Sequence, residues 1–167
     1  MSASDQDTTC LRRAIQLARE AERSGNLPIG ALVCLDGEVI AEGMNSIWRP
    51  VVDLTRHAEM EALRSVPAHL WSRSREMTLF TTLEPCLMCA GAILLHQIGR
   101  LVFGALDPYG GVGVAVQNLP PYFREQFLLV EWIGPVLPEE CDPLYTRARE
   151  LEHMRERLHQ EGQHPDA

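Results

Sequence analysis

The segment from residue 77 to residue 89 constrains the fold more than any other part of the chain. Met77 to Leu83 reads Met-Thr-Leu-Phe-Thr-Thr-Leu, which predicts a buried strand. The strand leads directly into Glu84 and then into Pro85-Cys86-Leu87-Met88-Cys89. From Cys86 to His96 the residues predict a helix, with small side chains that permit close packing on a sheet. A strand that runs at once into a helix indicates a layered α/β domain.

The spacing of the two cysteines points to metal chemistry. Cys86 and Cys89 are separated by two residues, so both sulfurs reach one ion from the first turn of the helix. A helix N-terminus carries unsatisfied N–H groups and a partial positive charge, which lower the thiol pKa and favour the thiolate. Taken alone, such a pair is also found in structural zinc sites and in redox pairs.

A second motif, His57-Ala58-Glu59, completes a ligand set for zinc. One imidazole and two thiolates suit Zn²⁺, and three protein ligands leave the fourth tetrahedral position to water. Glu59 lies two residues from His57, near enough to carry a proton to or from that water. A closed, structural site would instead take a fourth ligand from Cys34, His69 or His96. The two motifs together favour the open site and are the signature of zinc-dependent nucleobase deaminases.

Length and cysteine usage indicate one globular domain in a reducing cytoplasm. The chain of 167 residues can bury one core, and we expect a deaminase domain over residues 1–161 with a disordered tail at 162–167. Cys10, Cys34 and Cys141 are scattered, which is no disulfide framework. No run is long and apolar enough for a membrane span, and residues 1–9 lack the features of a signal peptide.

The charge balance bears on the substrate. The net charge is −8, and all 15 basic residues are arginine. An acidic chain has no overall field that attracts nucleic acid, which lowers the expectation of a polyanionic substrate. A local arginine patch remains compatible with this balance.

Hydrophobic periodicity predicts helices and strands in alternation. A first helix carries apolar residues over 11–21, with Thr8 or Thr9 as its cap. Asp36-Gly37, between apolar runs at 29–35 and 39–41, predicts a hairpin. We further expect a helix at 56–64 capped by Asp53 or Thr55, a connection at 67–75, strands at 77–83, 100–105 and 127–133, helices at 86–96 and 143–160, and an irregular segment at 106–121.

Several segments carry a resemblance to a known family. Residues 82–92 (Thr-Leu-Glu-Pro-Cys-Leu-Met-Cys-Ala-Gly-Ala) and 98–105 (Ile-Gly-Arg-Leu-Val-Phe-Gly-Ala) closely resemble the bacterial tRNA adenosine deaminases of the cytidine deaminase-like superfamily. Residues 28–31, 42–45 and 57–59 follow the family's order, and the resemblance covers roughly residues 11–149. It implies a three-layer α/β/α domain with a five-stranded mixed sheet, often in a homodimer.

The resemblance also implies roles for single residues. His57, Cys86 and Cys89 would bind Zn²⁺, and Glu59 would shuttle protons. Asn45 would hydrogen-bond the base, and the backbone N–H of Ala58 would help to position it.

Departures from the family pattern gather on the substrate side. Asp53-Leu54-Thr55-Arg56 replaces the usual Asp-Pro-Thr-Ala, Tyr109 stands where the family has a lysine, and Gln97 where it has an arginine. Residues 111–115 also replace a usual Gly-Ala-Ala-Gly-Ser. The family's basic C-terminal helix becomes residues 144–160, where glutamates lie near the arginines. These changes weaken the tRNA assignment without touching the chemistry.

Some residues keep two interpretations. Asn45 is a base contact or a turn residue, and Asp107 is a substrate contact or a loop cap. Arg56 is a phosphate contact or a solvated arginine. Further candidates for the pocket, with packing or surface roles as the alternative, are Trp48, Arg49, Tyr109, Tyr122 and Phe123. His96 is a metal ligand or, as we expect, a histidine on the helix surface or at an interface.

The sequence therefore predicts a hydrolytic, zinc-dependent deaminase that removes the exocyclic amine of a nucleobase as ammonia. Adenosine in tRNA, converted to inosine, is the leading substrate. A free nucleobase or nucleoside of the guanine, cytosine or adenine type is the close alternative. An alternative of another class is a non-catalytic, zinc-stabilised partner subunit.

Overall fold

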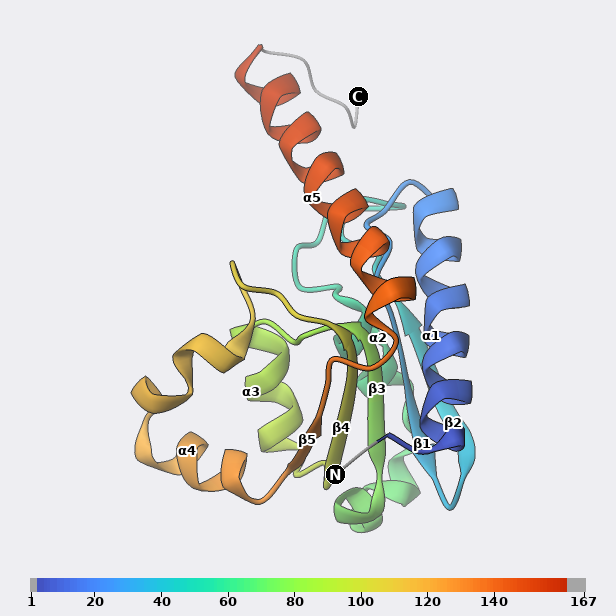
Figure 1. Cartoon of the computed structure of the whole chain (residues 1–167), viewed down its shortest axis with the longest axis vertical. Helices are drawn as coiled ribbons and strands as arrows, with labels where there is room; N and C mark the ends of the chain where they lie inside the picture. Colours follow the sequence, from blue (N-terminus) through green and yellow to red (C-terminus); the bar gives the residue numbers. More distant parts are fainter. Residues whose placement is uncertain (1–2, 162–167) are drawn as a thin grey trace.

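A five-stranded sheet forms the centre of the computed structural model, which describes residues 3–161 (Figure 1). The strands lie in the order β2-β1-β3-β4-β5. Their bounds are β1 (Gly30–Leu35), β2 (Glu38–Met44), β3 (Thr78–Leu83), β4 (Arg100–Ala105) and β5 (Glu131–Ile133). β1 is antiparallel to both of its neighbours, whereas β3, β4 and β5 are parallel. The predicted mixed sheet is confirmed.

Helices cover both faces of this sheet, as Figure 1 shows. α1 (Asp5–Arg23) and α5 (Pro138–Gln160) pack on one face; α2 (Ala58–Ser65), α3 (Leu87–Leu95) and α4 (Pro121–Leu128) lie on the other. Strand β1 is buried throughout because its side chains alternate between two cores. Ala31 and Val33 join the core under α2 and α3, and Leu32 joins the core under α1. The three-layer α/β/α architecture is therefore confirmed.

The Asp36-Gly37 pair forms the predicted hairpin turn between β1 and β2. Both residues have positive φ, 53° and 82°, which is the backbone conformation that a two-residue hairpin loop requires. Glycine adopts it without steric cost, and aspartate is among the residues that tolerate it.

The expected cap of the first helix is wrong. Ser4 caps α1: its hydroxyl accepts the Asp7 N–H at 3.1 Å, and the Asp7 carboxylate accepts the Ser4 N–H at 2.8 Å. This reciprocal capping box starts the helix at Asp5. Thr8 and Thr9 lie inside it, and their hydroxyls donate to the Asp5 carbonyl.

Other boundaries also move. The expected strand at 127–133 is shorter, because residues 121–128 form α4 and only Glu131–Ile133 pairs with β4. Phe127 stacks on Trp132 at 4.3 Å and its carbonyl accepts the indole N–H at 3.2 Å, so the chain turns between them. The last helix begins at Pro138 instead of residue 143. The connection at 67–75 and the irregular segment contain short 3₁₀ helices, η1 (Ala68–Glu76) and η2 (Val112–Asn118).

Within residues 3–161, no helix is long and apolar enough to cross a membrane. The tail expected at 162–167 lies outside the described residues.

Candidate active site

The N-termini of two neighbouring helices bring three metal-binding side chains together. His57 is the N-cap of α2, Cys86 is the N-cap of α3, and Cys89 follows in the first turn of α3. Nδ1 of His57 lies 3.7 Å from Sγ of Cys86 and 3.6 Å from Sγ of Cys89. These donor atoms all lie within 4.8 Å of one another.

The spacing of the three donors fits a zinc ion. Zinc binds imidazole nitrogen at about 2.0 Å and thiolate sulfur at about 2.3 Å, so tetrahedral geometry separates the two atoms by about 3.6 Å. The two nitrogen–sulfur distances match this value. Across the described chain, this is the one group of three or more His, Cys, Asp or Glu side chains with such geometry.

The candidates for a fourth protein ligand lie elsewhere. Cys34 belongs to the core under α1, where its sulfur lies 3.6 Å from that of Cys10. The ring of His96 stacks on Trp71 at 4.3 Å. None of Cys34, His69 and His96 joins the donor group. The arrangement is that of a three-ligand site, which is the catalytic type.

Cys86 is readily available as a thiolate. A hydrogen bond from Cys89 is the largest cause that lowers the pKa of the Cys86 thiol, which falls to about 4, and a hydrogen bond from His57 adds to it. The start of α3 supplies N–H groups and positive dipole charge in the same direction.

Glu59 lies behind the donor group, on the first turn of α2. Glu59 is only 4% exposed, and burial raises the pKa of its carboxyl group above the ordinary value. Oε1 accepts a hydrogen bond from Thr81 Oγ1 at 3.3 Å, and Oε2 lies 3.5 Å from Sγ of Cys89. A buried carboxyl with a raised pKa, adjacent to the ligands, suits a group that takes up and gives back a proton.

Asn45 follows β2 directly and is fully buried. Its N–H donates to the Ile29 carbonyl at 2.9 Å, and its Oδ1 accepts the Ile47 N–H at 3.4 Å, which is the predicted turn role. Among the described residues, its Nδ2 is the one buried side-chain N or O atom without a hydrogen-bond partner. The next residue, Ser46, donates its N–H to the carbonyl of Arg56, so Asn45 is tied to the segment that precedes His57. The amide can therefore serve the turn and still donate to a ligand.

Ala58 opens helix α2, so its N–H has no i−4 partner within the helix. This is the N–H that, by the family resemblance, would help to position the base.

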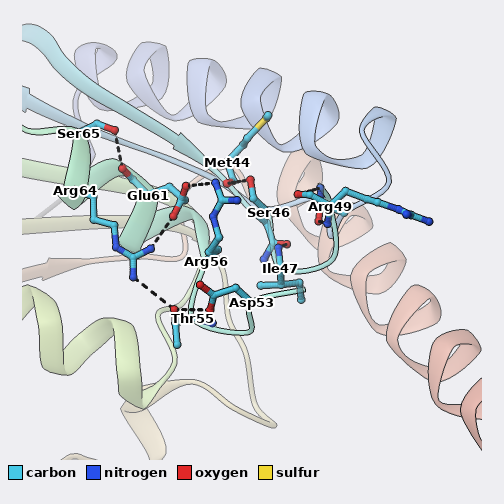
Figure 2. Close-up of polar contacts among 12 residues, drawn as sticks. Met44, Ser46, Ile47, Arg49, Asp53, Thr55, Arg56, Glu61, Arg64 and Ser65 are labelled. Carbon is cyan, nitrogen blue, oxygen red and sulfur yellow. Dashed lines mark hydrogen bonds and ion pairs between the residues drawn. The ribbon is translucent and has the colours of Figure 1, made fainter. Parts of the chain in front are cut away.

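The loop between β2 and α2 has two groups of polar contacts, which Figure 2 shows, and the first makes the expected cap of α2 wrong. The Asp53 carboxylate accepts the N–H and the hydroxyl of Thr55 at 2.9 and 2.6 Å, so neither residue caps α2. The guanidinium of Arg56 donates to Glu61 at 2.8 Å, and Glu61 also accepts from Arg64 at 2.8 Å. Arg56 is thus engaged in an ion pair on the surface of α2.

Asp107 has the contacts of a loop cap. Its Oδ1 accepts the N–H of Tyr109 at 3.0 Å, the N–H of Gly110 at 2.9 Å and the hydroxyl of Tyr145 at 3.1 Å. A contact between Asp107 and substrate stays a prediction. Phe123 packs against the core and makes an edge-on contact with Tyr122 at 5.4 Å, which favours packing for this pair.

Helix α5 forms one wall of a cleft of about 600 Å³. Trp48, Leu54 and Tyr109 line the cleft from the loops, and Arg149 and His153 line it from the helix. Each aromatic ring is covered by an α5 arginine: Arg149 lies 4.4 Å from the centre of the Tyr109 ring, and Arg155 lies 4.6 Å from that of Trp48. Periodicity alone did not predict this wall, although Arg149, Glu152, His153 and Glu156 repeat at helical spacing and all line the cleft.

Comparison with known proteins identifies the fold and the family. Residues 4–105 match the cytidine and deoxycytidylate deaminase zinc-binding region. The chain belongs to this family. The deaminase is a zinc enzyme that acts on a nucleobase, and the predicted cofactor is confirmed.

The deaminase is similar to proteins named tRNA-specific adenosine deaminases. It is 39% identical to the tRNA-specific adenosine deaminase of Bacillus subtilis over 139 residues, which cover 81% of this chain and 84% of that protein. It is 42% identical to the enzyme of the same name from Haemophilus influenzae over 142 residues, covering 83% and 80%. A solved structure from a study of A-to-I editing by tRNA:A34 deaminases superimposes with a TM-score of 0.67 at 33% identity, covering 82% of this chain and 99% of that chain. The predicted resemblance is confirmed.

Proposed function

We propose that this deaminase converts adenosine to inosine in tRNA, with Zn²⁺ held by His57, Cys86 and Cys89. The observation that carries the proposal is the triangle of donors with the buried carboxyl of Glu59 beside it. The choice of substrate is supported by relatives at about 40% identity that are named tRNA-specific adenosine deaminases.

The reaction is a hydrolysis. Water adds to the amine-bearing carbon of the adenine ring, the carbon–nitrogen bond to the amine breaks, and inosine and ammonia are formed. Zn²⁺ supplies a Lewis acid that activates water at neutral pH. Glu59 takes the first proton that water loses and delivers it to a ring nitrogen. It then takes the second proton, from the hydroxyl group added to the carbon, and delivers it to the amine as the carbon–nitrogen bond breaks. Burial raises the pKa of its carboxyl group, which makes the carboxylate a better acceptor for the proton that water loses.

Asn45 and Ala58 are our candidates for holding the base. The unpartnered Nδ2 of Asn45 is a buried donor, and a buried donor without an acceptor costs free energy that a base acceptor would recover. The N–H of Ala58 at the start of α2 offers a second donor. Asp107 would act on substrate through the loop it caps.

A free base or nucleoside is the second candidate substrate. The net charge is −8, and several arginines that would meet phosphates are engaged by acids. Arg147 donates to Glu22 at 2.7 Å, and Arg149 donates to Glu152 at 2.6 Å. A non-catalytic partner subunit is disfavoured because a purely structural zinc site has no use for a carboxyl such as Glu59.

We also infer that the enzyme is a cytoplasmic homodimer. Helix α3 is apolar on all sides, yet Leu87 and Leu95 on it are exposed. Leu87 lines an apolar hollow of about 240 Å³ between α3, η2 and α4 that also includes Gly91 and Phe123. An exposed apolar patch of this kind is typical of a protein interface.

An ammonia-release screen of the purified, zinc-loaded protein tests the proposal. Substrates are tRNA, adenosine, cytidine, guanine and cytosine. Release from tRNA alone supports the proposed function, whereas release from one of the small molecules with none from tRNA would replace it with the second candidate.

A further inference from the structure

Glu84 is a buried carboxylate that takes no part in the proposed chemistry. It stands between the end of β3 and the metal-binding segment, and it is 9% exposed. Oε2 accepts the N–H of Asp107 at 3.0 Å, and Oε1 accepts the N–H of Gly113 at 2.9 Å. Its own N–H donates to the Ala105 carbonyl at 2.8 Å. Each carboxyl oxygen of Glu84 therefore holds one end of the segment 107–113.

The same segment pairs with the chain around Cys86. Gly111 and Cys86 form an antiparallel bridge, and the N–H of Val112 donates to the Pro85 carbonyl at 2.9 Å. Glu84, Pro85 and Cys86 are consecutive, so three neighbouring residues fix one loop beside a candidate zinc ligand.

Two glycines make room for the Glu84 carboxyl. A Cβ atom added to Gly113 would lie 2.5 Å from Glu84 Oε1, and one added to Gly111 would lie closer still to Oε2. Neither glycine has a positive φ, so lack of space and not backbone conformation excludes a side chain there. The carboxyl and the loop are fitted to each other.

The opposite side of the loop faces the cleft. Tyr109 is 78% exposed and lines the cleft beneath the guanidinium of Arg149, while Asp107 is bound by the Tyr145 hydroxyl. The loop is thus held on one side by the Glu84 carboxylate and on the other by two α5 side chains, the Tyr145 hydroxyl on Asp107 and the Arg149 guanidinium on Tyr109. Movement of the loop relative to Cys86 would move Tyr109 and with it one wall of the cleft.

We propose that Glu84 is a positioning residue that keeps the 107–113 loop in register with Cys86 and thereby sets the affinity for substrate. It touches no reacting atom and acts through the backbone of the loop. The part of this inference that concerns substrate rests on the proposed function.

The first test is Glu84→Gln in the zinc-loaded full-length protein. An amide places an NH₂ group against one of the two N–H donors, so one hydrogen bond is lost and two donors face each other. We expect one zinc per chain, a rise of KM for a tRNA substrate by about tenfold and a kcat within about threefold of the parent. Glu125→Gln, at an exposed position on α4, is the matched control and should leave both constants unchanged. An unchanged KM, or loss of zinc together with kcat, would overturn the proposal.

The second test is a double-mutant cycle with Gly113. Alone, Gly113→Ala forces the Glu84 carboxyl to move, and we expect KM to rise by a similar factor. In a Glu84→Ala background the added methyl group meets no carboxyl, so Gly113→Ala should change KM by less than about twofold further. Multiplicative effects of the two substitutions would contradict a shared mechanism.

Hydrogen exchange separates this proposal from the proposed function. In Glu84→Gln the backbone amides of residues 107–113 should exchange faster than in the parent, while those of α3 exchange at the parent rate. In the control variant Glu125→Gln, exchange over residues 107–113 should also match the parent. If the parent releases no ammonia from tRNA, the proposed function fails, and the exchange result still decides the role of Glu84. Unchanged exchange over 107–113 would overturn that role.

Discussion

Oε2 of Glu59 lies 3.5 Å from Sγ of Cys89, although the two residues belong to different helices and are 30 positions apart. The contact exists because α2 and α3 begin side by side at the same edge of the molecule, with His57 and Cys86 as their N-caps. It places a buried carboxyl against the metal-binding donors.

Glu59→Ala should keep zinc and fold but lose almost all turnover. General acid–base catalysis is commonly worth about 10²–10⁴-fold, and Glu59 acts in more than one proton transfer, so the loss should reach the upper end or exceed it. Glu59→Gln keeps the size of the side chain and should lose as much. Ammonia release measures the effect, and near-normal release by either variant would mean that the proton role is misassigned.

Cys86→Ala should lose zinc and thermal stability together, because the free energy of metal binding contributes to folding. A chelator should lower the Tm of the parent towards that of the variant. Cys10→Ala, at a buried cysteine away from the site, should keep about one zinc per chain and still respond to the chelator. Cys86→Ala with full zinc content would contradict the assigned ligand set.

The Asp7–Arg100 pair should make stability depend on pH. Hydrogen bonds from Arg100, at 2.7 and 2.9 Å, lower the pKa of the Asp7 carboxyl from 3.8 to about 2. Since the folded pKa lies below the unfolded value, the stabilisation is present above about pH 4 and is lost as the pH falls towards 2. Asp7→Asn should lower the free energy of unfolding by about 2 kcal/mol at pH 7.

Denaturant unfolding of Asp7→Asn and the parent at several pH values checks this. The difference between them should shrink between pH 4 and pH 2, and Asp5→Asn, at an exposed position in the same first turn of α1, should show little change. A difference that stays constant with pH would mean that Arg100 is not the cause.

Binding to tRNA should be weak and depend little on salt. Each phosphate contact adds to the salt dependence of affinity, but Arg56, Arg147 and Arg149 already pair with glutamates, and the chain carries −8. We expect a shallower salt slope than that of a basic relative, measured as tRNA affinity at two salt concentrations. Tight binding with a steep slope would show that these ion pairs open for phosphates.

Local patterns predicted the parts of the molecule that depend on near neighbours. The Asp36-Gly37 turn and the strand before Glu84 follow from residue type and spacing, as does the position of the cysteines on the first turn of α3. The error at residues 127–133 has a physical reason: a short apolar run reads alike as a strand or as a half-buried helix. At Phe127 the stacking with Trp132 decides the outcome, and that contact is not visible in a periodicity.

Contacts between segments that are distant in the chain could not be predicted from the sequence. Glu84 meets Gly113 only because β3 and β4 are adjacent, and Tyr109 meets Arg149 only because α5 crosses over the loop. The capping box of Ser4 and Asp7, in contrast, is a local signal that the spacing does contain.

Formation of inosine at the wobble position of tRNA tests the central claim most directly. The zinc-loaded protein is incubated with tRNA that carries adenosine there, and the nucleosides are then quantified by mass spectrometry beside the ammonia released. We predict one inosine for each ammonia with the parent and neither product with Glu59→Ala. No inosine in tRNA, with rapid ammonia release from guanine, cytosine or a nucleoside, would contradict the account.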